Sequence, residues 1–216
     1  MAFIPVLARI PLFVCLAAAL MSGGRAVAAD GEGPSFSCAR AQGAAETLVC
    51  QDPVLARLDR TLSAIYGEAL ALSRSLPDGG EDLRSLKAVQ RGWVKGRDDC
   101  WKSEDLRSCV ESAYQGRIGT LIALYRLRPS GGAVFYMCNG QPADEIAAEF
   151  FAAPSAEANG SVRLERGDRV VAGVQVRSGS GALYEAESGI SIWLKGDEAR
   201  LEWPEGVVSQ CRVKGA

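Results

Sequence analysis

The sequence predicts an α+β protein built as two separate domains, a disulfide-stapled helical domain followed by a small eight-stranded antiparallel β-barrel. The first observation is a change in hydrophobic period, from helical spacing up to Tyr125 to strand spacing from Ala133 onward. The second is the Pro-Ser-Gly-Gly run at 129–132, whose composition is typical of a linker. We therefore expect a helical domain over 30–130 and a barrel over 131–216.

The first 29 residues have the parts of a secretory signal peptide. A basic residue precedes an apolar run at 10–21 that is too short to span a bilayer, and Ala26-Val27-Ala28 offers an A-x-A cleavage site. Cys15 lies in this segment, but no small residue stands immediately before it, as bacterial lipoprotein processing requires. We expect cleavage after Ala28 or Ala29, a periplasmic or secreted mature protein, and neither a lipid anchor nor membrane insertion.

An even number of cysteines remains after the signal peptide. They are Cys38, Cys50, Cys100, Cys109, Cys138 and Cys211. In an exported protein this count favours disulfides over metal ligands or nucleophiles, although it leaves the pairing open. The chain has no histidine, which excludes Ser-His-Asp triads, Cys-His pairs and histidine-based metal sites. We expect no catalytic residues, no metal and no cofactor.

The excess of acidic over basic residues lies in the second half of the chain. From Gly131 onward there are 12 acidic residues and 8 basic residues, and the whole chain has a net charge of −2. An acidic surface argues against a nucleic acid partner, whose phosphates need a basic footprint. It suits a cationic partner.

Four helices are expected in the first half. They are a short helix between Cys38 and Cys50, a long helix from Pro53 past Ala69, a third over about 83–97, and a fourth from near Ser103 to Tyr125. Asp52 is suited to cap the second helix because Pro53 fits its first position. Glu104 and Asp105 should lie in the first turn of the fourth helix, where carboxylates complement the helix dipole.

Eight short runs of strand type follow, separated by turns rich in Gly, Asn, Pro or Asp. We expect strands at 133–138, 145–151, 161–165, 169–176, 182–187, 190–195, 199–203 and 207–213. This number of short, evenly spaced strands is typical of a small antiparallel barrel.

The stretch at 178–199 combines a glycine-rich loop with a strand that stops at a lysine. Gly179 and Gly181 flank Ser180 and allow turn conformations, so Ser180 should be exposed. The strand ending at Lys195-Gly196 places an ammonium group at a turn. Judged by these patterns alone, Ser180 is a turn residue and Lys195 a solvated strand end.

The same stretch resembles the signature of the MliC/PliC family, the membrane-bound and periplasmic inhibitors of C-type lysozyme. The matching residues are Ser178, Ser180, Gly181, Ala182, Tyr184, Trp193, Lys195, Gly196, Glu198 and Ala199. The resemblance continues over the whole second half, from Tyr136-x-Cys138 to Cys211. It implies a disulfide between Cys138 and Cys211.

The resemblance also implies a function and a set of contact residues. The protein would inhibit C-type lysozyme by inserting the Ser180 loop and the Lys195 turn into the active-site cleft, and the implied binding residues are Ser180, Lys195, Gly181 and Tyr184. Two features depart from the family pattern. Leu183 stands where the family usually has Arg, and the hairpin between Tyr184 and Trp193 is one residue longer.

The first half, about 37–127, resembles the LprI-like domain, a cysteine-containing helical module of exported bacterial proteins that has also been linked to lysozyme inhibition. The matching residues are Cys38, Cys50, Leu55, Leu58-Asp59, Tyr66, Gln90, Trp93, Arg97-Asp98, Cys100, Cys109, Tyr114 and Arg117-Ile118. We assign no binding residues here. We expect Tyr66, Trp93 and Tyr114 in the core, Arg97 bonded locally to Asp98, and local disulfides Cys38–Cys50 and Cys100–Cys109.

Two other functions stay open at the level of sequence. In the first, the helical domain binds another protein of the cell envelope and the barrel only supports it. In the second, Lys195 activates Ser180 as a nucleophile, since Ser-Lys hydrolases need no histidine. An exposed lysine keeps a high pKa and no oxyanion hole is recognisable, so we expect an inhibitor and not an enzyme. The sequence predicts no oligomeric state.

Overall fold

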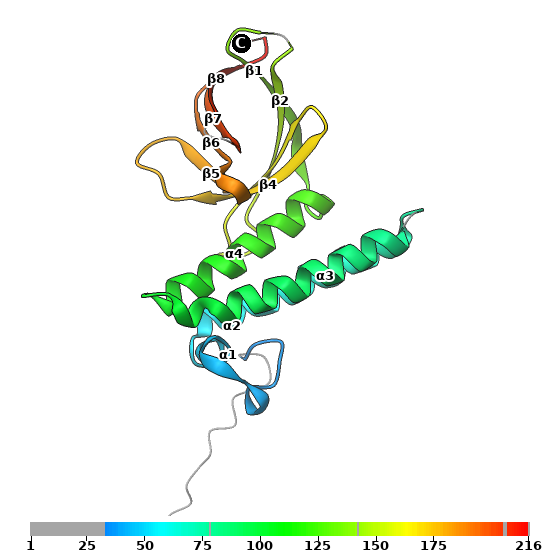
Figure 1. Cartoon of the computed structure of the whole chain (residues 1–216), viewed down its shortest axis with the longest axis vertical. Coiled ribbons are helices and arrows are strands. Elements are labelled where there is room, and N and C mark those ends of the chain that lie inside the picture. Colours follow the sequence, from blue (N-terminus) through cyan, green and yellow to red (C-terminus); the bar gives the residue numbers. More distant parts are fainter. Residues whose placement is uncertain (1–32, 78, 142, 205–206, 216) are drawn as a thin grey trace, which may run out of the picture.

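The computed structural model describes residues 33–77, 79–141, 143–204 and 207–215. Within these residues four α-helices precede eight strands that close into an antiparallel barrel, which confirms the predicted fold class. Figure 1 shows the barrel above the helices, with the C-terminus at the far end of the barrel. The predicted signal peptide at 1–29 lies outside the described residues.

The helices are α1 (Gly43–Gln51), α2 (Pro53–Ser75), α3 (Gly79–Asp98) and α4 (Leu106–Tyr125), with 3-10 turns η1 (Cys38–Arg40) and η2 (Asp99–Lys102). The predicted cap of α2 is present, because Asp52 Oδ1 accepts hydrogen bonds from the N–H groups of Val54 and Leu55 at 2.8 and 3.2 Å. The helix α4 begins later than predicted. Asp105 is its N-cap and accepts a hydrogen bond from the N–H of Ser108 at 2.9 Å. The carboxylate therefore lies before the first turn and satisfies one of the N–H groups that have no partner within the helix.

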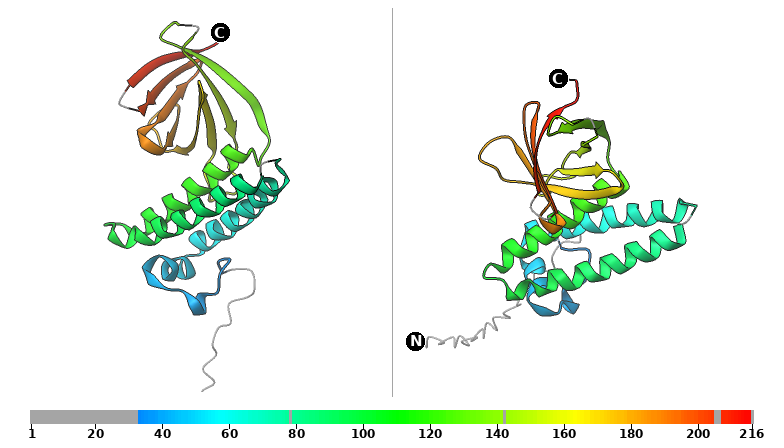
Figure 2. Two further views of the ribbon diagram at one scale, coloured as in Figure 1. Left: turned by 45° about the vertical axis from the view of Figure 1, so that its right-hand side comes forward. Right: turned by 45° about the horizontal axis from the view of Figure 1, so that its top comes forward.

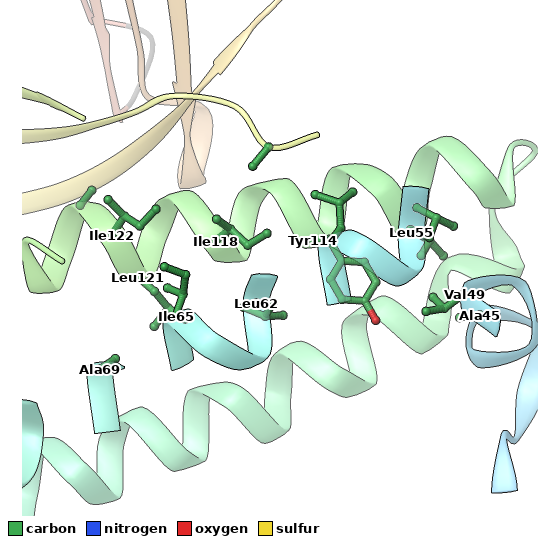
Figure 3. Close-up of a cluster of buried hydrophobic side chains, with 14 of the residues drawn as sticks. Ala45, Val49, Leu55, Leu62, Ile65, Ala69, Tyr114, Ile118, Leu121 and Ile122 are labelled. Carbon is green, nitrogen blue, oxygen red and sulfur yellow. The ribbon is translucent and has the colours of Figure 1, made fainter. Parts of the chain in front are cut away.

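A continuous apolar core holds the helices together (Figure 3). Side chains at helical spacing supply it, and those exposed by 1% or less include Val49, Leu55, Leu58, Ile65, Ala69, Val110, Tyr114, Ile118, Leu121, Ile122 and Ala123. Tyr114 is fully buried as predicted, whereas Tyr66 and Trp93 are only partly buried at the edge of this core.

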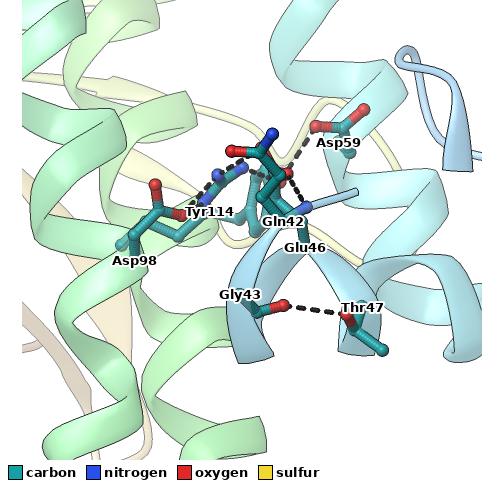
Figure 4. A network of polar contacts seen from close by, with 8 residues as sticks. Gln42, Gly43, Glu46, Thr47, Asp59, Asp98 and Tyr114 are labelled. Atoms are coloured by element: carbon teal, nitrogen blue, oxygen red, sulfur yellow. Dashed lines mark hydrogen bonds and ion pairs between the residues drawn. The ribbon is translucent and has the colours of Figure 1, made fainter. Parts of the chain in front are cut away.

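A partly buried polar network connects all four helices (Figure 4). Arg97 bonds Asp98 at 2.6 Å, as expected, but it also donates to the hydroxyl of Tyr114 at 2.9 Å and approaches Glu46 at 3.5 Å. Tyr114 in turn donates to Asp59 Oδ1 at 2.9 Å. Burial raises the pKa of Tyr114 well above its ordinary value, so the phenol stays protonated and keeps its role as a donor.

The barrel strands are β1 (Ser130–Cys138), β2 (Glu145–Phe151), β3 (Ser161–Arg166), β4 (Arg169–Val176), β5 (Ala182–Ala186), β6 (Ser191–Lys195), β7 (Glu198–Trp203) and β8 (Val207–Val213). Each strand pairs with the next, and β8 returns to β1 through pairs such as Cys138 with Cys211. Alternate side chains point inward, so that Ile146, Val162, Leu164, Ile192 and Leu201 form a second, separate core. The 3-10 turn η3 (Glu187–Gly189) replaces the last residue of the predicted fifth strand.

Three disulfides are present, and all three have the expected pairing. They are Cys38–Cys50, Cys100–Cys109 and Cys138–Cys211. Two staple the helical half and the third ties the first barrel strand to the last.

The predicted linker belongs partly to the barrel. β1 already begins at Ser130, and the pairing of β1 with β2 shifts between Ser130 and Ala133, so Gly131 and Gly132 form a bulge within the strand. Gly132 has a φ of +89°, a conformation that glycine adopts without strain.

Helix α4 packs directly against the outer wall of the barrel, as both views in Figure 2 show. A Cβ atom on Gly119 would lie 2.6 Å from Val174 Cγ2, so the glycine allows this close approach. Phe151 and Ala172 point outward from the barrel and join the helical core. Ion pairs between Arg57 and Glu157 at 2.6 Å and between Arg126 and Glu149 at 2.7 Å also join the two halves.

Candidate functional site

The Ser180 loop, residues 177–181, connects β4 to β5 and is exposed throughout. The Ser178 hydroxyl donates to the carbonyl oxygen of Gly181 at 2.9 Å. Trp193 Nε1 donates to the carbonyl oxygen of Ser180 at 2.7 Å. These bonds hold the backbone of the loop, while the Ser180 hydroxyl makes no hydrogen bond to any described residue. It is therefore available to a partner molecule.

Gly181 is required by the geometry of this loop. Its φ of +69° lies in the left-handed region, and a Cβ atom there would overlap the carbonyl oxygen of Leu194. The contact brings the loop against β6. Gly181 therefore acts through the backbone, by fixing where Ser180 stands.

Lys195 is the last residue of β6 and is exposed. The chain turns through Gly196 and Asp197, and Gly196 has the positive φ that a two-residue hairpin turn needs. Lys195 lies across from Glu198, but Glu198 is paired with Arg212 at 3.0 Å. Among the described residues Lys195 has no ion-pair partner, so its ammonium group is free to meet a carboxylate.

The structure brings the loop and the lysine turn together. Pairing of β5 with β6 sets Ala182 opposite Leu194, which leaves Gly181 and Lys195 next to each other at the same end of the two strands. The hydrogen bond from the Trp193 indole to the Ser180 carbonyl also joins the Ser180 loop to β6. The connection between β5 and β6 contains the turn η3, and the strands keep a regular register on both sides of it.

Tyr184 does not lie on this surface. Its side chain is only 9% exposed and belongs to the barrel core, where its ring centroid lies 5.5 Å from that of Phe150. Burial also raises the pKa of its phenol. Because Ala182, Tyr184 and Leu194 all point into the barrel, Tyr184 supports the loop from inside.

Leu183 pairs with Trp193 across β5 and β6, and both side chains are half-buried. Leu183 thus places an apolar side chain beside the indole that bonds the Ser180 carbonyl. No hydrogen bond between Ser180 and Lys195 is present in the described part of the chain, and Lys195 is exposed, so the geometry lacks the contact that would activate a serine nucleophile.

Each half of the chain matches a family described as a lysozyme inhibitor. Residues 136–209 match the family described as membrane-bound lysozyme-inhibitor of c-type lysozyme, MliC, and residues 38–128 match the family described as lysozyme inhibitor LprI. The protein is therefore a two-domain member of the lysozyme-inhibitor families. Its LprI domain precedes its MliC barrel.

The chain belongs to the LprI family. It is 33% identical over 181 residues to proteins named lipoprotein LprI from Mycobacterium bovis and from two strains of Mycobacterium tuberculosis, CDC 1551 and H37Rv. The aligned region covers 84% of this chain and 85% of each relative. No solved structure matches the chain.

The described residues contain neither a membrane-spanning helix nor a metal-binding cluster of side chains. No helix there is long and apolar enough to cross a membrane, and His, Cys, Asp and Glu side chains form no group of three or more that could hold a metal ion.

The role of Trp193 was missed in the sequence. The sequence marks Trp193 only as part of a family signature, although its indole donor bonds a loop 13 residues away and decides where Ser180 stands. The sequence signal for this role was a tryptophan two residues before the lysine at the turn.

Proposed function

We propose that this protein inhibits C-type lysozyme by placing the Ser180 loop and the Lys195 turn in the enzyme's active-site cleft. The observation that carries the proposal is the side-by-side placement of the Ser180 loop and the Lys195 turn, whose hydroxyl and ammonium groups have no hydrogen-bond or ion-pair partner among the described residues. The match of both halves to lysozyme-inhibitor families supports it.

The chemistry of the enzyme explains why this pair of groups would block it. Lysozyme uses two carboxyl groups, one a protonated acid and the other ionised. The Ser180 hydroxyl is suited to hydrogen-bond the acid, and the Lys195 ammonium to pair with a carboxylate. While both groups are occupied the glycan has no place to bind. Inhibition then requires binding alone and no chemical step by this protein.

The proposal retains the division predicted from the sequence. A signal peptide over 1–29 is removed on export, the helical domain comprises 30–130, and the barrel over 131–216 carries the inhibitory loop. The mature protein acts in the periplasm or outside the cell, where C-type lysozyme meets the bacterial wall.

The test is a titration of lysozyme activity with the wild type, Lys195→Ala and Ser180→Ala. Truncating one partner of a buried charge pair costs about 2 to 5 kcal/mol, so Lys195→Ala should weaken inhibition by roughly 30-fold or more. A hydroxyl bonded to a charged group contributes about 1.5 to 3 kcal/mol, so Ser180→Ala should be the milder change.

Matched controls are Lys87→Ala and Ser103→Ala, which remove an exposed lysine and an exposed serine from the helical half. Both controls should inhibit like the wild type, and all five proteins should melt at similar temperatures. Unchanged inhibition by a folded Lys195→Ala variant would contradict insertion of this turn, and would direct attention to the helical domain as the binding surface.

A further inference from the structure

A cleft of about 1180 Å³ lies between helix α4 and the barrel, directly beside the Ser180 loop. Ser178 and Gly181 line the cleft and also belong to the Ser180 loop. In Figure 1 the turn between β4 and β5 projects at the left, on the same side as the N-terminal half of α4. The cleft and the candidate site are therefore parts of one continuous surface that both halves of the molecule form.

Two glycines on α4 mark where the helix touches the barrel and where it leaves open space. Gly119 lets the helix touch the barrel, because a Cβ atom there would lie 2.6 Å from Val174 Cγ2 and 3.2 Å from Ser161 Cβ. Gly116 stands one turn earlier and has no atom within 4 Å of where its Cβ would lie. The helix thus meets the barrel at Gly119 and diverges from it toward its N-terminus.

The helix lines the cleft with small side chains at a spacing of four residues. Ser108, Ser112, Gly116 and Thr120 lie along one face of α4, and all four line the cleft. These short residues leave room for the side chains of another molecule between α4 and β5.

The cleft offers acceptors and negative charge. Three of its lining residues are glutamates, Glu111, Glu185 and Glu187, and one is an arginine, Arg177. The Glu111 carboxylate is already paired with Arg107 at 2.6 Å, so Glu185 and Glu187 supply the unpaired negative charge. Glu185 and Glu187 are exposed and have no ion-pair partner among the described residues. The side-chain oxygen of Gln115, another lining residue, is buried and accepts no hydrogen bond in the described structure. Such a lining suits the donors of Lys and Arg side chains.

We propose that this cleft extends the lysozyme-binding surface onto helix α4. When the Ser180 loop and Lys195 turn occupy the enzyme's active site, the cleft receives basic side chains from the enzyme surface beside it. Basic side chains complement the negative charge of the lining. The inference rests on the proposed function, and it gives the helical domain a direct part in binding.

The test uses the full-length protein and fills the cleft at its open glycine. Gly116→Arg adds bulk and positive charge where a Cβ meets no other atom, so it should weaken inhibition by about tenfold or more. Gly116→Glu adds similar bulk with the opposite charge and should weaken it less. The matched control is Gly96→Arg, at an exposed glycine of α3 that likewise has no atom within 4 Å of its Cβ position. This control should inhibit like the wild type.

Two additions keep the test decisive. Ser112→Arg, at an exposed position four residues before Gly116, repeats the charge and bulk if Gly116→Arg fails to fold. Lys195→Ala, measured in parallel, reports on the proposed function alone. Loss of inhibition in Lys195→Ala with full inhibition by folded Gly116→Arg and Ser112→Arg would overturn the role of the cleft and leave the proposed function standing.

The converse result is equally distinct. Loss in Gly116→Arg with full inhibition by Lys195→Ala would support binding at the cleft and contradict insertion of the lysine turn. Gel filtration of each variant without lysozyme gives a further outcome. If filling the cleft changes the oligomeric state, a second copy of this chain occupies it and the proposal is wrong.

Discussion

Ser180 can offer its hydroxyl because other groups hold the backbone around it. Trp193 Nε1 bonds the Ser180 carbonyl at 2.7 Å, Ser178 bonds the Gly181 carbonyl, and Gly181 lies against β6. A partner that binds this loop therefore pays little for ordering it, which is the benefit of preorganisation.

Replacing Trp193 by Phe tests this support. The ring keeps most of its apolar contact but loses one hydrogen bond, whose net contribution is about 0.5 to 1.5 kcal/mol. We expect inhibition of lysozyme to weaken by about two- to tenfold. The measurement is an inhibition titration accompanied by a thermal melt. Trp101→Phe is the matched control, because Trp101 is 64% exposed in the helical half. Equal inhibition by the two variants would show that the indole bond does not position the loop.

The sequence predicted the exposure of Ser180 and Lys195 but not the burial of Tyr184. Glycines and a strand end mark a turn in any fold, so the first two follow from local chemistry. Alternation along a strand shows that Ala182 and Tyr184 share a face, yet it does not show which face is inside. That choice depends on closure of the barrel, which decides the position of every strand at once.

Helix α4 carries two glycines that should respond in opposite ways to the same change. Gly116→Ala should stabilise the protein by about 0.5 to 1 kcal/mol, because glycine is a poor helix former and the added methyl group meets open space. Gly119→Ala should destabilise it by about 1 to 3 kcal/mol, because its methyl group would press on Val174 and Ser161. Chemical unfolding of both variants measures the difference. Equal stabilisation by the two changes would mean that α4 does not pack closely on the barrel.

The boundaries of helices and strands were predicted well where neighbouring turn residues mark them. The strands from β2 to β4 agree with expectation to within one residue, since turn residues bound each of them. The start of β1 was placed too late, because Gly131 and Gly132 read as a linker but form a bulge. The start of α4 was placed too early, because an aspartate before a helix suits either the cap or the first turn.

The contact between the halves should be sensitive to acid. Ion pairing with Arg57 lowers the pKa of Glu157, and for Glu149 hydrogen bonds from Ser130 and Arg126 outweigh burial and lower its pKa too. A carboxyl group with a lowered pKa in the folded state stabilises that state above its ordinary pKa of 4.5 and loses this effect as pH falls. We therefore expect the melting temperature to drop as pH falls from about 5 to about 3.

The double variant Glu149→Gln, Glu157→Gln should show a flatter dependence over that range, since neither side chain then titrates. Glu198→Gln is the control, because Glu198 pairs with Arg212 on the exposed surface of the barrel away from α4. Identical pH profiles for the wild type and the double variant would show that these two ion pairs contribute nothing to joining the halves.

The arrangement of the two halves was not predicted, although α4 held a signal. Apolar or small residues lie on more than one face of this helix, with Tyr114 and Ile118 toward the other helices and Gly119 toward the barrel. A helix buried on two sides needs a second layer to cover it. The glycine-rich composition of the linker instead favoured two separate domains.

The disulfide between Cys138 and Cys211 has a consequence for resistance to proteases. The two cysteines are 73 residues apart, so the covalent loop that they close contains every barrel turn from the β1–β2 connection to the β7–β8 connection, including the Ser180 loop. A protease that cuts one exposed turn leaves both pieces attached through sulfur, and the pairing of the strands holds them in place. A nicked molecule would run as one band without reductant and as two with it. A protein cut once in any of these turns would thus keep its barrel assembled.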